Sequence, residues 1–492
     1  MVKKVLSMLL AACMLVTGIP AAAAGAAEKA TCTEYSGSNR NAQDYATWAD
    51  TVKSYLTVCE DGSLMRFQYA EGNDGYVAEY YDSSYQLLST RAIPAELPLF
   101  GGFYAAKDSH FILTGQSNKK ESASVECYRI TKYDKDWKRL GSTGLYDCNT
   151  TIPFRAGSAR MTEAGDYLLI RTCHEMYTSR DGKNHQANVT IQLNRDTMQI
   201  TDSFTRVMNS SYGYVSHSFN QFIRVEDGKI VAVDHGDAYP RSVALIRYPL
   251  NVLDGSFSAR GCEVTDMLEI PGEIGANYTG VSVGGFEYSG TAWLAAGNKV
   301  DFDSTDRTTR NIFVAAVAKE TEEVTVNQIT NYSADDVKAP TPHLVKTGAD
   351  DVVILWSLSD SVYYTWLDGS GRQTGELYKL EGSLSDCVPL IYGGKIVWYT
   401  WKDSTVTFYE IDARTPSETR RIEVQSGHTW ECISVKNHTA TLKCTKCGKK
   451  KTVATPDSVN IWWQEQESTD GYYYSKFSNP FELGESIRYW IV

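Results

Sequence analysis

The chain alternates between short strands of mixed polarity and short strands that are almost wholly apolar. Seven times, a run with high β propensity reaches a tight turn containing Gly or Asp and is followed by a strongly apolar run. A strand that is apolar on both faces is typical of a sheet packed between two other sheets. The seven pairs are Tyr55–Cys59 with Leu64–Tyr69, Gly101–Ala106 with Phe111–Thr114, Ser158–Thr162 with Tyr167–Arg171, Phe219–Val225 with Ile230–Val233, Val281–Tyr288 with Ala292–Ala296, Leu344–Thr347 with Val352–Trp356, and Val388–Tyr392 with Ile396–Trp401.

A further strand follows most of these pairs and ends in Asp or Asn, at Asp82, Asp134, Asn194, Asp368 and Asp412. Two hairpins in roughly 55 residues predict a four-stranded sheet, and a series of such sheets predicts a β-propeller. We therefore expect an all-β fold with a seven-bladed propeller over residues 45–425. Six or eight blades, or a pair of β-sandwiches, are the alternatives.

Residues 1–27 have the three parts of a secretory signal peptide. Lys3 and Lys4 precede the apolar stretch Val5–Ile19, and small residues with several Ala-x-Ala cleavage choices follow. Leu10–Cys13 also fits a lipoprotein signal, but the apolar stretch continues past the cysteine. We expect an exported protein, secreted or attached to the cell surface, with residues 28–44 as a short N-terminal segment. No later apolar run reaches the roughly 18 residues of a transmembrane span.

Composition narrows the class of partner. Aromatic residues make up 12% of the chain, which favours strands, and the net charge is −12. That charge argues against nucleic acid as a partner, because phosphate binding needs a basic face. Ten cysteines remain after removal of the signal peptide, and we expect mostly buried thiols with one or two disulfides. We expect a monomer.

Propeller geometry predicts where the histidines lie. The residue before each innermost strand and the residues after the next strand are at one face of the ring, around the axis. Five of the eight histidines fall at such positions, and such clustering is typical of a binding or active site. The predicted ligand-binding residues are His174, His185, His217, Gln221, His235, Asp237, Tyr239, Arg241 and His343. Each histidine taken alone has a structural alternative, as a hydrogen-bond partner that holds a loop.

Several chemistries suit this set of side chains. Neutral imidazoles near the axis can hold a divalent metal, whereas protonated imidazoles and arginines can hold an anionic sugar or sulfate. One histidine can also act as nucleophile or general base. We expect a binding protein for a glycan or peptide. The alternative is a secreted enzyme that uses the same pocket, either a metal-dependent polysaccharide lyase or hydrolase or a group transferase.

One blade carries a resemblance to known families. The run from His217 through Asp227-Gly228 to Asp234-His235-Gly236-Asp237 resembles secreted propellers of the arylsulfotransferase type, in which a histidine precedes one strand and a basic residue follows the next. The basic residue is here His235 rather than Arg. The gathering of histidines with a glutamine is also similar to oligogalacturonate-lyase propellers, which hold a metal, although the spacing differs. These resemblances imply the enzyme alternative, without a catalytic residue that can be assigned.

Residues 426–452 differ from the rest of the chain and carry a candidate zinc site. Cys-x-x-Cys-Gly is a zinc knuckle, because the glycine allows the turn that directs two thiolates at one ion. The stretch resembles small His-x-Trp…Cys-x-x-Cys-Gly modules of secreted and surface proteins of Gram-positive anaerobes. It implies a structural zinc, with a disulfide or redox pair of the last two cysteines as the alternative. The surrounding lysines predict either a solvated basic face or a contact with a polyanionic cell-wall polymer. The candidate ligands are His428, Cys432, His438, Cys444 and Cys447, with Cys432 or His438 as the fourth. Residues 453–492 are strand-like and predict a further β segment, complete or incomplete.

Overall fold

The computed structural model describes residues 49–454, apart from 70–74, 207–210, 212, 252–255, 258–261, 306–307, 333–340, 403–404, 426–429, 437–438 and 445–449. The described residues form seven antiparallel sheets of four or five strands and an eighth sheet of three strands. No α-helix occurs in this part of the chain, and it therefore contains no helix that could cross a membrane. We number the first seven sheets in chain order.

Each sheet is built from strands that are consecutive in sequence. The first four sheets contain β1 (Ser54–Val58), β2 (Leu64–Tyr69), β3 (Gly75–Tyr81) and β4 (Leu87–Pro94); β5 (Leu99–Ala105), β6 (His110–Gly115), β7 (Tyr128–Tyr133) and β8 (Arg139–Leu145); β9 (Ile152–Pro153), β10 (Arg160–Ala164), β11 (Tyr167–Thr178), β12 (Asn184–Asn194) and β13 (Ile200–Phe204); and β14 (Ser218–Glu226), β15 (Lys229–Gly236), β16 (Ser242–Asn251), β17 (Ser256–Phe257) and β18 (Glu263–Glu269).

The next three sheets have four strands each, and the eighth has three. They contain β19 (Val281–Tyr288), β20 (Ala292–Lys299), β21 (Asn311–Ala318) and β22 (Val324–Gln328); β23 (His343–Lys346), β24 (Val352–Leu358), β25 (Ser361–Leu367) and β26 (Tyr378–Glu381); β27 (Leu390–Tyr392), β28 (Lys395–Lys402), β29 (Thr405–Asp412) and β30 (Thr419–Gln425); and β31 (Trp430–Lys436), β32 (Thr439–Cys444) and β33 (Lys450–Ala454).

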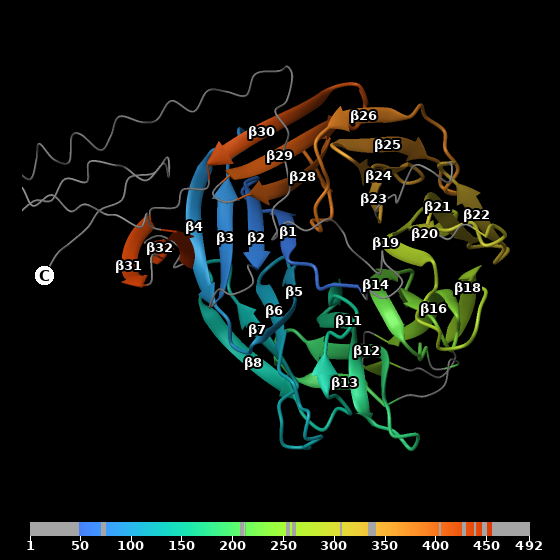
Figure 1. Cartoon of the computed structure of the whole chain (residues 1–492), viewed down its shortest axis with the longest axis horizontal. Helices are drawn as coiled ribbons and strands as arrows, with labels where there is room; N and C mark the ends of the chain where they lie inside the picture. The colour runs from blue at the N-terminus through green and yellow to red at the C-terminus, as the bar shows by residue number, and fades with distance from the viewer. Residues whose placement is uncertain are drawn as a thin grey trace, which may run out of the picture.

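The seven sheets are arranged in a ring, with an inner strand of each sheet toward the centre (Figure 1). The inner strands are β1, β5, β10, β14, β19, β23 and β27, and in each sheet the second strand pairs with the inner one in antiparallel register. This arrangement confirms the predicted all-β propeller fold. It also confirms the seven hairpins expected from the hydrophobic pattern, each at its predicted place in the sequence.

The second strand of each sheet is buried on both faces, as the apolar pattern predicts. In β6 all six residues are buried, and in β24 the first six are buried. Seven apolar clusters fill the spaces between neighbouring sheets, and the cluster of Leu64, Val397 and Tyr399 joins the seventh sheet to the first. Burial of apolar side chains between every pair of neighbours is therefore what holds the ring together.

The three-stranded sheet lies within the stretch predicted to bind zinc. Its strands pair in the order β31, β32, β33, and the Cys432 thiol contacts the Ser434 carbonyl oxygen at 3.7 Å. His428, His438 and Cys447 lie outside the described residues, as does the side chain of Cys444. The zinc site therefore stays a prediction, as do the signal peptide and the strand-like segment that follows residue 454.

Candidate functional site

A cavity of about 440 Å³ occupies the centre of the ring, and every inner strand or the segment beside it contributes to its wall. Most of the lining is apolar, from residues such as Leu56, Phe103, Phe222 and Leu390. A volume of several hundred cubic ångströms with a mainly apolar wall and a few polar groups is typical of a site for a small ligand. The remaining lining residues are Tyr55, Thr57, Tyr104, Ala105, Ala159, Arg160, Met161, Arg224, Gly284, Gly285, Phe286, Glu287, Leu344, Val345, Lys346, Val388, Pro389 and Ile391.

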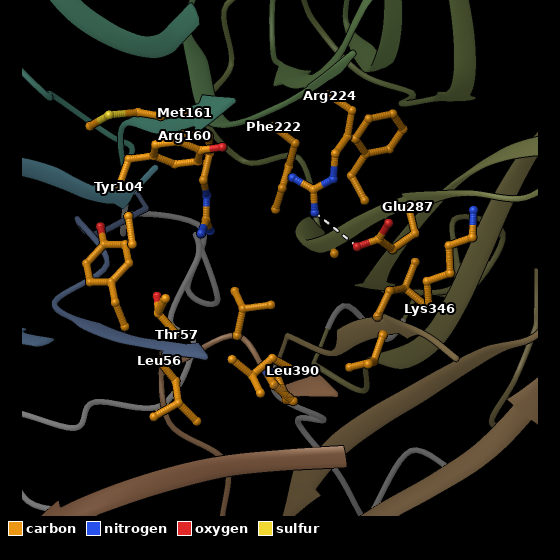
Figure 2. Close-up of a pocket in the computed structure, with 18 of the residues that line it drawn as sticks. Leu56, Thr57, Tyr104, Arg160, Met161, Phe222, Arg224, Glu287, Lys346 and Leu390 are labelled. Carbon is orange, nitrogen blue, oxygen red and sulfur yellow. Dashed lines mark hydrogen bonds and ion pairs between the residues drawn. The ribbon is translucent and has the colours of Figure 1, made fainter. Parts of the chain in front are cut away.

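Three cationic side chains and one carboxylate line this cavity (Figure 2). Arg224 Nη2 lies 3.0 Å from Glu287 Oε1, so these two charges neutralise each other. Lys346 Nζ lies 4.2 Å from the centre of the Tyr288 ring. Among the described lining residues one carboxylate faces three cations, so this wall is positive within an acidic protein.

Arg160 differs from the other two cations because its guanidinium has unused hydrogen-bond donors. Among the described residues, Nε and Nη2 have no acceptor, although both atoms are shielded from solvent. The guanidinium carbon lies 4.8 Å from the centre of the Phe222 ring, and the group points toward the middle of the cavity (Figure 2). Burial lowers the pKa of Arg160 from its usual value. A buried guanidinium with unfilled donors is a ready partner for a carboxylate or another planar anion.

Other titratable groups lie close to Arg160. Asp386 is 8% exposed, and its Oδ2 accepts a hydrogen bond of 2.6 Å from the Lys53 backbone N–H. Its Oδ1 has no partner among the described residues, and burial raises the pKa of Asp386 to about 6. Burial also raises the pKa of Tyr55 to about 12, an effect that the nearby Arg160 partly offsets. The protonation state of Asp386 therefore changes close to neutral pH, next to the cavity.

Of the five predicted histidines, the structure brings His185 and His217 together. His185 Nδ1 and His217 Nε2 are 3.4 Å apart, and His217 Nδ1 lies 2.8 Å from Oδ1 of the predicted residue Asp237. His217 immediately precedes β14, while Asp237 immediately follows β15. The rule that these positions share one face therefore places two of the predicted residues correctly relative to each other.

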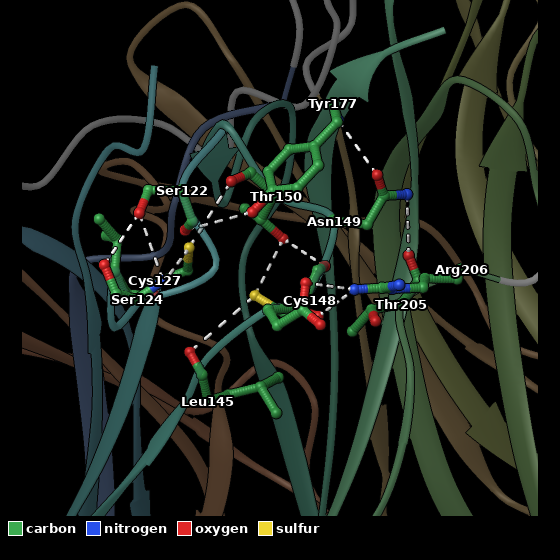
Figure 3. Close-up of polar contacts among 12 residues, drawn as sticks. Ser122, Ser124, Cys127, Leu145, Cys148, Asn149, Thr150, Tyr177, Thr205 and Arg206 are labelled. Atoms are coloured by element: carbon green, nitrogen blue, oxygen red, sulfur yellow. Dashed lines mark hydrogen bonds and ion pairs between the residues drawn. The ribbon is translucent and has the colours of Figure 1, made fainter. Parts of the chain in front are cut away.

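The other three histidines are buried in separate surroundings. His174 is fully buried, and its Nδ1 lies 2.7 Å from the Thr150 hydroxyl. The Cys148 thiol donates to the same hydroxyl at 3.5 Å (Figure 3). His343 Nε2 lies 2.9 Å from the Ser385 carbonyl oxygen. Neither ring nitrogen of His235 has a partner among the described residues, and its ring packs against Phe219. None of the five histidines lines the central cavity.

The remaining predicted residues have structural contacts or lie in solvent. Gln221 is buried, and its Nε2 donates to the Ser218 hydroxyl at 2.7 Å. Arg241 donates to the carbonyl oxygens of Asp237 and Ala276 at 2.8 and 2.7 Å, and so holds the loop that carries Asp237. Tyr239 is 64% exposed. Within the described ranges, no group of three or more His, Cys, Asp or Glu side chains is placed to hold a metal ion.

The residues that give the cavity its charge were not predicted from the sequence. Arg160, Arg224 and Lys346 each lie on an inner strand. In a sequence, a single basic residue in a strand usually indicates a solvent-exposed side chain, so none of the three stood out. The signal becomes visible when the seven inner strands are aligned, because a basic residue then recurs in three of them at positions that face the axis.

No family model and no curated protein sequence matches the chain. Among solved structures, BamB from Moraxella catarrhalis is 11% identical with a TM-score of 0.39, over 82% of this chain and 98% of that one. The Dos1 propeller is 11% identical with a TM-score of 0.41, over 82% of this chain and 93% of that one. Prolyl oligopeptidase B from Galerina marginata is 9% identical with a TM-score of 0.47, over 80% of this chain but 55% of that one. These are likenesses of fold alone.

Proposed function

We propose that the chain is an exported propeller protein that binds a peptide through a free carboxylate in its central cavity. The observation that carries this proposal is the Arg160 guanidinium, whose Nε and Nη2 donors are shielded from solvent and have no acceptor among the described residues. Such donors are costly to leave unpaired, so a shift of the Arg160 side chain that brings them to an anion in the cavity gains a charge-assisted hydrogen bond.

The rest of the wall supports a peptide more than a glycan. The exposed aliphatic surface of Leu56, Leu390 and Ile391 suits apolar side chains of a peptide. Sugars stack on exposed aromatic faces, whereas the lining rings of Phe103, Phe222 and Phe286 are at most 4% exposed. Arg224 and Lys346 add positive charge around the ligand. Since the one lining carboxylate, Glu287, is already engaged by Arg224, the polar groups favour binding over acid–base catalysis.

Binding of short peptides with an apolar last residue tests this proposal. We expect the free-acid peptides to bind and their C-terminal amides to bind at least tenfold more weakly, because the amide removes the charge that Arg160 receives. Arg160→Met should abolish this preference. Arg206→Met is the matched control, because Arg206 is an exposed arginine remote from the cavity lining.

Two results contradict the proposal. Equal affinity of the free-acid and amide peptides shows that the cavity does not recognise the C-terminal carboxylate. Binding of uronate oligosaccharides that Arg160→Met weakens, with no peptide binding, assigns the same arginine to a glycan ligand instead. Isothermal titration calorimetry measures both, and circular dichroism of each variant checks that the fold is retained.

A further inference from the structure

A second constellation lies away from the cavity, between the third and fourth sheets. His185 is the second residue of β12, and His217 lies in the segment that leads into β14. The His217 backbone N–H donates to the Gln186 carbonyl oxygen at 2.9 Å, which fixes this segment against β12. The two imidazole rings are nearly parallel, with an interplanar angle of 19° and centroids 5.7 Å apart. The backbone therefore holds both rings in place.

Each histidine has a carboxylate at its outer ring nitrogen. His185 Nε2 lies 2.9 Å from Asp181 Oδ2, and His217 Nδ1 lies 2.8 Å from Asp237 Oδ1. Asp237 is fully buried, and its Oδ1 is close enough to His217 Nδ1 for an ion pair, although the two atoms are not aligned as a hydrogen bond. Asp181 Oδ1 also accepts hydrogen bonds from the Ser179 hydroxyl and, at 3.0 Å, from the Lys183 backbone N–H, so its carboxylate is held beside His185. Both carboxylates favour a proton on the outer nitrogen.

The inner nitrogens are then left with lone pairs that face each other. A neutral imidazole carries one N–H, so with both outer nitrogens protonated, His185 Nδ1 and His217 Nε2 are two acceptors only 3.4 Å apart. Two acceptors at that distance repel unless a cation lies between them. Two nitrogen ligands of a tetrahedral zinc ion, each at 2.0–2.1 Å, are themselves about 3.4 Å apart. The spacing therefore matches that of two ligands on one metal ion.

We propose that His185 Nδ1 and His217 Nε2 are the protein ligands of a divalent transition-metal site, with Asp181 and Asp237 as the carboxylates that orient the two rings. The side chains of His185 and His217 are 29% and 21% exposed, so water fills the remaining coordination positions. Imidazole ligands favour Cu²⁺ above Zn²⁺ and Ni²⁺. A site with two protein ligands and bound water is exchangeable, unlike the four-ligand site expected in residues 426–452.

This metal site is separate from the proposed function. His217 precedes β14 by one residue, whereas Arg224, which lines the cavity, is seven residues further along, or roughly 20 Å in an extended strand. The metal therefore has no direct contact with a ligand in the cavity, and either proposal can fail without the other.

Equilibrium dialysis against Zn²⁺ tests the proposal on the full chain carrying Cys432→Ser, Cys444→Ser and Cys447→Ser, which remove the three cysteines among the candidate zinc ligands of the tail. We expect one bound equivalent, lost in both His185→Gln and His217→Gln. Lys183→Ala is the matched control, because Lys183 is exposed on the same turn as Asp181. This variant should keep the metal. Asp237→Asn should weaken binding by about 10- to 100-fold, since loss of an orienting carboxylate has that effect.

A measurement on the chain without histidine substitutions guards against variants that fail to fold. With one equivalent of Cu²⁺, we expect an electron paramagnetic resonance spectrum with coupling to two imidazole nitrogens. A spectrum of aqueous copper, or coupling to a single imidazole, overturns the proposal. So does zinc binding that either histidine variant retains, or a pair that takes up a shared proton and no metal at 100-fold excess.

Discussion

Asp386 shows how burial sets the chemistry of a single residue beside the cavity. Its carboxyl group is 8% exposed and receives one backbone hydrogen bond, from Lys53. Desolvation dominates over that bond and over the attraction of Arg160, so the pKa rises to about 6. Between pH 4 and 6 the folded protein therefore holds a proton that the unfolded chain releases. Ionised Asp386 lowers the free energy of unfolding, and this loss develops as the pH rises through that window.

Asp386→Asn should therefore raise the free energy of unfolding at pH 7.5. The shift of the pKa from 3.8 to about 6 corresponds to roughly 2–3 kcal/mol at full ionisation. The asparagine keeps an acceptor for the Lys53 N–H, and the gain should disappear at pH 4, where the aspartic acid is already protonated. Urea unfolding at both pH values measures this. Asp136→Asn, at an exposed turn position, should change neither value, and a loss of stability in Asp386→Asn at pH 7.5 contradicts the assignment.

The site was only partly predictable because the relevant distances depend on side-chain geometry. Propeller topology brings the residue before β14 and the residue after β15 to one face, and the pairing of His217 with Asp237 follows from that rule. The same rule cannot separate a histidine that reaches another side chain from one whose ring turns into the core, as that of His235 does. Arg160 was missed because its importance depends on its surroundings: its Nε and Nη2 donors have no acceptor among the described residues, and a sequence does not show this.

At the level of strands, the hydrophobic pattern correctly predicted the second strand of each sheet, because burial on both faces requires apolar residues throughout that strand. The second strand of each sheet is covered on both faces, so its sequence is apolar throughout and easy to recognise. Third strands were found from a terminal Asp or Asn, and this marker misses β21, which ends at Ala318. It was also not recognised in β16, where the third strand runs to Asn251. Outer strands such as β8 are mainly exposed or half-buried, so selection for apolar residues is weak there and their pattern is faint.

A buried ion pair joins two neighbouring sheets and provides a test at this level. Arg171 of β11 and Asp234 of β15 are both fully buried, with Nε–Oδ1 and Nη2–Oδ2 distances of 2.8 Å. Asp234→Ala should lower the free energy of unfolding by about 3–5 kcal/mol, because it leaves the guanidinium buried and unpaired. Arg171→Met combined with Asp234→Leu should recover much of that loss. Urea unfolding of Arg171→Met, Asp234→Leu and the double variant gives the coupling energy, and additive losses of the two single variants contradict this interpretation.

The ring as a whole closes through side chains instead of a shared sheet. Within residues 49–454, as far as the structure describes them, the first sheet contains β1–β4 and the seventh β27–β30, so no described strand from one end of the ring completes a sheet at the other. The contact instead includes the Tyr85 hydroxyl, which donates to Glu410 at 2.6 Å, and the Tyr399 hydroxyl, which donates to the Phe67 carbonyl at 3.2 Å. Closure therefore depends on packing of the complete chain, and groups that are buried in every sheet contribute to one cooperative structure.

Buried histidines make the stability of this structure sensitive to acid. His110, His174 and His235 have pKa values lowered to about 3, and His343 to about 4, in each case mainly by burial. They belong to the second, third, fourth and sixth sheets. Below pH 6.5 these histidines bind protons in the unfolded chain but stay neutral in the folded protein. The free energy of unfolding therefore falls as the pH drops from 6.5 toward 3. At pH 5 each of the four histidines accounts for a loss of about 2 kcal/mol.

Urea unfolding between pH 7 and 4.5 should therefore show a steep loss of stability, opposed only in small part by protonation of Asp386. In His174→Gln the loss between pH 7 and 5 should be smaller by about 2 kcal/mol, because glutamine keeps a polar side chain that does not titrate. In Asp386→Asn the loss should instead be larger, since that variant lacks the opposing group. Unchanged stability down to pH 5 in the unsubstituted chain means that the four rings are charged in the folded protein, and that the core around them admits water.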